Sequence, residues 1–161
     1  MRRKLSLAEA VQTAATLFQL NTEPQALQTI YQNSGLAEQA DEDIFVAEWL
    51  AYVHACLVYA LMEQAPAAVV VEYLRQTGAM LQSRGYGLEI VDKFIDRRFS
   101  QYLAALADQR AKDCPGLLFR AVWGAEIAEV PAKSAGTICV AMSMVLAAIL
   151  DKLEEYDYRC A

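Results

Sequence analysis

The feature that most constrains this fold is an apolar stretch at residues 44–62. Its 19 residues contain no Lys, Arg or Asp, and Glu48 and His54 are its only strongly polar members. A helix that is apolar on every side lies either in a membrane or at the centre of a protein. A bilayer span takes roughly 20 such residues, so the length alone permits both locations.

Three features favour the centre of a soluble protein. Glu48 near the start of the stretch and His54 at its centre would both be costly in lipid. Residues 41–43 are all acidic and no Lys or Arg follows before Arg75, so the basic flank that orients a span is absent. The final apolar run, residues 138–150, is too short to be a second span. We therefore predict that this helix is packed on all sides by others.

The rest of the chain also favours helices. Gly (7) and Pro (4) are few, and no alternating strand pattern persists for more than a few residues. A hydrophobic fraction of 56% in 161 residues supplies one core. We predict an all-α fold, a single domain over residues 1–161, built as a compact bundle of six to seven helices. The helices near 44–64 and 135–156 are expected to be the most buried.

Caps and breakers predict where the helices begin. Ser6 and Glu9 have the spacing of a capping box, and Gly35 suits a left-handed helix end. Residues 88–112 carry the most regular amphipathic pattern and predict one long helix. The predicted helix starts are Ser6, Pro24, Asp41, Pro66, Leu88, Pro115 and Ser134.

One stripe of the central helix combines carboxylates with tyrosines. Glu48, Tyr52, Ala55, Tyr59 and Glu63 fall on the same side of a helical wheel. A tyrosine has an apolar body with a polar tip, and a carboxylate needs a partner or water. We expect this stripe to face a groove, a loop or the edge of the core.

His54 is the only histidine in the chain. A single histidine excludes a di-iron centre with paired Glu-x-x-His motifs and excludes His-rich zinc sites. Its helical neighbours are Leu50, Leu57 and Leu61, so we predict a buried, neutral imidazole. The functional alternatives are a role through titration near neutrality and haem ligation.

Motifs for nucleophilic or phosphate chemistry are missing. The sequence contains no G-x-S-x-G, no G-x-G-x-x-G and no C-x-x-C, and Lys133-Ser134 lacks the glycine-rich approach of a phosphate loop. Cys56 and Cys139 lie in apolar segments, where a free cysteine acts as a small hydrophobic side chain. We predict no cofactor.

Two clusters of charged residues have some features of a metal site and of a nucleic-acid-binding patch, respectively. Two pairs of carboxylates are spaced three or four residues apart: Asp92 with Asp96, and Glu126 with Glu129. Each pair could contribute to a Mg²⁺ or Ca²⁺ site, but such a site needs several more oxygen ligands than the pair supplies. Bases with interleaved aromatics resemble a nucleic-acid patch, diluted by nearby acids; its members are Lys93, Phe94, Arg97, Arg98, Phe99 and Tyr102. We predict a solvated helix face in both cases, with neither a metal nor a nucleic acid bound.

Charge is distributed unevenly along the chain. Residues 5–74 contain nine acids and no Lys or Arg, whereas residues 75–133 contain nine bases and seven acids, within a net charge of −6. The acidic half either pairs with the basic segment inside the molecule or faces a basic partner outside it. The first alternative predicts ion pairs, and the second a contiguous acidic face.

The absence of catalytic motifs favours a nonenzymatic protein-interaction module. It would act through the acidic N-terminal half or through homo-oligomerisation, since so apolar a composition is hard to hide in one small core. We expect a homodimer, formed by the 88–112 helix and by a final helix with Met142, Met144, Val145 and Ile149 on more than one face. The candidate interaction or ligand residues are Glu48, Tyr52, His54, Tyr59, Glu63, Arg97, Arg98 and Met142.

Two alternative functions remain open. A bundle of this composition could bind an apolar small ligand in a pocket lined by Met142, Met144, Phe119 and Trp123. An enzyme using Glu48 and His54 ranks third, because these two side chains do not share a helix face. Polar residues interrupt residues 5–20, so no signal peptide is indicated and we expect a cytoplasmic protein.

Overall fold

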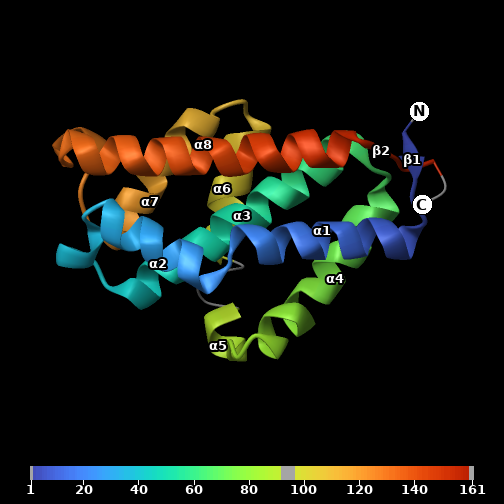
Figure 1. Ribbon diagram of the computed structural model, residues 1–161, viewed down its shortest axis with the longest axis horizontal. Helices are drawn as coiled ribbons and strands as arrows, with labels where there is room; N and C mark the ends of the chain where they lie inside the picture. The colour runs from blue at the N-terminus through green and yellow to red at the C-terminus, as the bar shows by residue number, and fades with distance from the viewer. Residues whose placement is uncertain (1, 92–96, 160–161) are drawn as a thin grey trace.

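The computed structural model describes residues 2–91 and 97–159, and these form an all-α bundle, as predicted. In Figure 1 the helix of residues 132–154 runs along most of the length of the bundle, and other helices cross it obliquely. The helices are α1 (Leu7–Asn21), α2 (Pro24–Asn33), α3 (Glu42–Gln64), α4 (Ala67–Ser83), the one-turn α5 (Leu88–Ile90), α6 (Arg97–Ala107), α7 (Cys114–Val122) and α8 (Ala132–Glu154). Short 3₁₀ turns lie at Leu36–Glu38, Ala111–Asp113 and Ile127–Glu129, and two short strands are β1 (Arg3–Lys4) and β2 (Tyr156–Asp157).

Helix α3 is the centre of the bundle. It is in contact with α1, α2, α4, α6, α7 and α8, and it crosses the middle of the molecule between α8 and α1 in Figure 1. Within an 18-residue stretch of α3 that is apolar enough to cross a membrane, 83% of the residues are buried. The predicted location of this helix is therefore confirmed.

The predicted caps explain several helix starts. The Ser6 hydroxyl accepts a hydrogen bond from the Glu9 backbone N–H, and the Glu9 carboxylate accepts one from the Ser6 N–H, both at 3.2 Å. The Asp41 carboxylate accepts from the first turn of α3. Gly35 adopts φ +81° after α2, a conformation that suits glycine. These local interactions confirm the capping box, the start of α3 and the left-handed turn.

Two predicted boundaries are wrong. Helix α6 ends at Ala107 rather than continuing to residue 112, because the chain turns at Gln109, which has φ +60°. Residues 92–96 of the predicted 88–112 helix lie outside the described residues. Helix α8 begins at Ala132 with Pro131 at its N-cap, so Ser134 does not cap it and is buried within its first turns.

The prediction that the last helix is among the most buried is also wrong. Only 22% of the 18-residue apolar stretch of α8 is buried. By length and composition alone, both α3 and α8 could cross a membrane, so the expectation that the final run is too short for a span is wrong as well. Helix α8 lies along the outside of α3 (Figure 1), so only one of its sides can reach the core. That side consists of Ser134, Ile138, Met142, Ile149 and Leu153.

The chain ends meet in a short parallel pairing that was not predicted. β1 pairs with β2, and the Leu5 N–H donates to the Asp157 carbonyl at 2.9 Å. Figure 1 places both ends at the same tip of the bundle. Two residues per strand are too few to produce an alternating pattern in the sequence.

Candidate functional site

Glu48 sits in a buried polar cluster between α3, α6 and α7. The Arg98 Nε donates to both of its carboxylate oxygens, at 3.0 and 2.9 Å, and the Tyr102 hydroxyl donates to Oε1 at 2.7 Å. Arg98 also donates to the Gln101 side chain and to the Leu117 carbonyl of α7. The Glu48 side chain is 3% exposed. One ion pair therefore holds three helices together.

The protonation of this cluster follows from burial and hydrogen bonding. Burial raises the pKa of Glu48, while the hydrogen bond from Tyr102 and the charge of Arg98 oppose that rise. Burial and the nearby Glu48 carboxylate raise the pKa of Tyr102 well above its ordinary value, so its hydroxyl remains a donor. Because the donors already engage the carboxylate, the cluster has the properties of a structural ion pair rather than of a general base.

The other stripe residues are also held by neighbouring elements. The Tyr52 hydroxyl donates to the Met142 carbonyl of α8 at 2.7 Å, and its ring packs edge-on against Tyr102. The half-buried Tyr59 accepts a hydrogen bond from the Gln109 side chain at 3.2 Å. Glu63 is exposed. Helices α6 and α8 thus cover the buried part of the stripe, and its other end reaches the turn at Gln109 and the surface.

His54 lies in an aromatic cage on another side of α3. It is 2% exposed, stacks on Tyr73 and packs against Phe99 and Phe18. Its Nδ1 lies 3.4 Å from the Tyr73 hydroxyl. Burial lowers the pKa of His54 to about 4, so the imidazole is neutral at pH 7. The predicted burial of His54 is confirmed.

The remaining candidate residues do not converge on one site. Arg97 is exposed, whereas Met142 is buried with its backbone carbonyl bound by Tyr52. Met142 and Phe119 belong to the core, but Met144 lies at the surface on the opposite side of α8. The four side chains expected to line an apolar ligand pocket therefore do not face a common cavity.

The two surface clusters are only partly described. Asp92, Lys93, Phe94 and Asp96 lie outside the described residues. Glu126 forms an ion pair with Arg120 at 2.9 Å. Over residues 2–91 and 97–159, no three His, Cys, Asp or Glu side chains come close enough to hold a metal ion.

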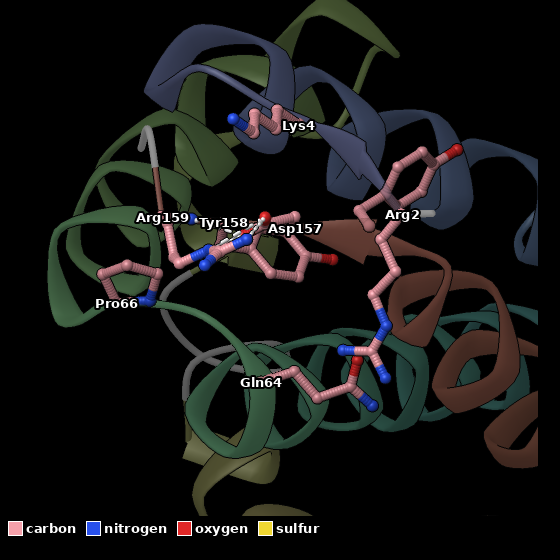
Figure 2. A pocket seen from close by; sticks show the side chains of 8 residues that line it. Arg2, Lys4, Gln64, Pro66, Asp157, Tyr158 and Arg159 are labelled. Carbon is pink, nitrogen blue, oxygen red and sulfur yellow. Dashed lines mark hydrogen bonds and ion pairs between the residues drawn. The ribbon is translucent and has the colours of Figure 1, made fainter.

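A pocket of about 700 Å³ lies where the two chain ends meet (Figure 2). It is lined by Arg2, Lys4, Gln64, Pro66, Tyr156, Asp157, Tyr158 and Arg159. Hydrogen bonds from Arg159 lower the pKa of Asp157 to about 2, so this carboxylate stays ionised and neutralises part of the positive charge. Arg2 and Lys4 are exposed. The pocket therefore combines the basic side chains of Arg2, Lys4 and Arg159 with one ionised carboxylate.

The acidic half pairs little with the basic segment. Among the described residues, Glu48 pairs with Arg98 across the fold, and Glu72 pairs with Arg75 only three residues away. Glu9 pairs with Arg3 near the N-terminus. The internal explanation of the charge distribution therefore applies to Glu48, and not to the acidic half as a whole.

The most distinctive surface is the outer face of α8, which we define as Lys133, Thr137, Val140, Met144, Ala147 and Asp151. Val140 is 59% and Met144 66% exposed, and no charged residue occurs between positions 134 and 150. On the opposite side of the helix, Tyr52 and Gln64 donate to the Met142 and Leu150 carbonyls. These two hydrogen bonds orient α8 so that its outer face points to solvent.

The chain was compared with protein families, curated proteins and solved structures. No family model, no curated protein and no solved structure matches the chain.

The buried ion pair generates a first prediction. Arg98→Met leaves the Glu48 carboxylate without its cation and should lower the free energy of unfolding by about 3–5 kcal/mol at pH 7. The loss should shrink as the pH falls, because burial raises the pKa of Glu48 and a protonated Glu48 needs no cation. The double variant Glu48→Leu/Arg98→Met should regain most of the stability. Urea unfolding measures the stability of the wild type, of Arg98→Met and of the double variant, with the exposed neighbour Arg97→Met as control. Equal losses of stability in Arg97→Met and Arg98→Met would contradict this account.

His54 generates a second prediction. The unfolded chain takes up a proton near the ordinary pKa of 6.5, whereas the folded chain does so only at about 4. Stability from the neutral imidazole is therefore complete above pH 6.5 and declines by about 1.4 kcal/mol per pH unit below it. His54→Gln removes this slope, so the stabilities of the two proteins should converge between pH 7 and pH 5 in urea unfolding. Parallel pH profiles would show that His54 is not buried and neutral.

Proposed function

We propose that this protein is a nonenzymatic association module whose working surface is the outer face of α8. One observation carries the proposal. Helices α3 and α8 have similar mean hydropathies of 1.7 and 1.8. Within the 18-residue apolar stretch of each helix, however, 83% of the residues of α3 but only 22% of those of α8 are buried. A long apolar helix that the core covers on one side only leaves its other side for a partner.

The composition of α8 supports a protein partner. Val140 and Met144 supply apolar contact area at the middle of the helix. Gly136, Ala147 and Ala148 are small and exposed, so the backbone of a second helix can approach closely. Other exposed apolar side chains, including Leu20 and Val71, lie on different helices.

The anchoring of α8 favours a protein over a bilayer. A membrane span would require α8 to leave α3, which would expose Ile138 and Met142 and break the hydrogen bonds from Tyr52 and Gln64. An apolar face that stays attached to the bundle is suited to docking against another folded surface. A cytoplasmic location is part of this proposal.

The internal pairing of the polar candidates supports a nonenzymatic role. Arg98 and Tyr102 engage Glu48, and aromatic rings enclose His54. Glu48 and His54 are each only 2% exposed, so a substrate has little access to either side chain.

The proposal predicts self-association that depends on Met144. Light scattering of the wild-type protein should give a mass that rises from one chain toward two across the micromolar range. Met144→Lys places a charge in the apolar face and should shift this equilibrium to the single chain. Met62→Lys is the matched control, because Met62 is 56% exposed but belongs to α3. A wild-type mass of one chain throughout would contradict self-association.

A further inference from the structure

We propose that the partner of the outer face is a second copy of this chain, with the two α8 helices packed antiparallel about a twofold axis at Met142. This inference rests on the proposed function and specifies its geometry. It follows from the spacing, the symmetry and the charges of the six residues that form the outer face.

The spacing of the outer face is that of a helix-pairing seam. Successive members, from Lys133 to Asp151, are separated by four, three, four, three and four residues. This alternation keeps all six positions on one nearly straight stripe, and it is the repeat with which two helices pack along their length. The inner residues Ile138, Met142 and Ile149 remain buried against the bundle. The seam is therefore separate from the core-facing side.

The outer face is also symmetric about Met142. Val140 and Met144 lie two residues before and after it, Thr137 and Ala147 five, and Lys133 and Asp151 nine. An antiparallel pair centred at this position brings each residue opposite the other member of its set. Val140 then packs on Met144 of the second copy at the centre.

Charge selects the antiparallel direction. The symmetric pair places Lys133 opposite Asp151 of the second copy at both ends of the seam, an attractive contact made twice. A parallel pair in register would place Lys133 on Lys133 and Asp151 on Asp151. Within the described part of the chain, neither residue has an ion-pair partner in its own fold. Antiparallel helix dipoles also attract, whereas parallel ones repel.

Small residues allow the helices to approach closely. Gly136 and Ala148 flank the seam, six residues before and after Met142, and both are exposed. The seam covers 19 residues, which is roughly 27 Å of helix at 1.5 Å per residue. This places the contact at the small end of specific interfaces and predicts a dissociation constant in the micromolar range.

Charge reversal at the two ends tests the geometry. Sedimentation equilibrium at low salt measures the dimer dissociation constants of the wild type, Lys133→Glu, Asp151→Lys and the double variant. Each single reversal makes both ends repulsive and should weaken the dimer by at least about tenfold. The double variant restores opposite charges at both ends and should return to within about threefold of the wild type. It also keeps the net charge of −6, which excludes an effect of total charge.

The control and the contradicting outcomes separate this inference from the proposed function. Lys112→Glu makes the same change in net charge at an exposed site away from α8 and should leave the dimer unchanged. If Met144→Lys weakens the dimer but the single charge reversals do not, the antiparallel register is overturned and the association surface is kept. The same conclusion follows if the double variant fails to restore the dimer. A wild type that stays monomeric, or that instead floats with phosphatidylcholine–phosphatidylglycerol vesicles, would overturn both proposals.

Discussion

The rest of the structure depends on the burial of α3 on every side. A helix of 23 residues with apolar side chains all around cannot be covered by one neighbour, so the chain surrounds it with α1, α2, α4, α6, α7 and α8. Burial of this kind is the dominant favourable contribution to folding. It also determines which polar groups can lie inside, because each needs a partner where water is excluded. Glu48 and His54 meet this requirement in different ways.

Glu48 links the acidic half of the chain to the basic segment, and His54 needs no such link. The carboxylate is ionisable and buried, so Arg98 and Tyr102 from α6 supply the donors it lost on leaving water. The imidazole instead becomes neutral and packs among aromatic rings. Both buried polar residues of α3 thereby contribute to holding the bundle together. The side of α8 that α3 does not cover is the surface that we propose for association.

Local patterns predicted the elements well, and interactions across the fold accounted for what was missed. The Ser6 capping box, the start of α3 and the turn at Gly35 each depend on residues a few positions apart, so they are visible in the sequence. The partner of Glu48 comes from 50 residues away, and no spacing rule identifies Arg98. Apolar composition could not distinguish α3 from α8, because burial depends on where a helix lies. The structure buries Glu48 and His54 among partners that the sequence did not identify. It also shows that Met144, already expected on a contact face of the final helix, lies at the surface.

Hydrogen exchange measured at two protein concentrations tests most directly whether these two equally apolar helices have opposite roles. The backbone amides of α3 should exchange slowest, through global unfolding, and their protection should rise with concentration only as far as dimerisation stabilises the whole fold. The amides of α8 should exchange faster than those of α3 at low concentration and should gain protection as the concentration rises, while those of α4 do not change. Exchange of α3 as fast as that of α8, or protection of α8 that is independent of concentration, would contradict the account.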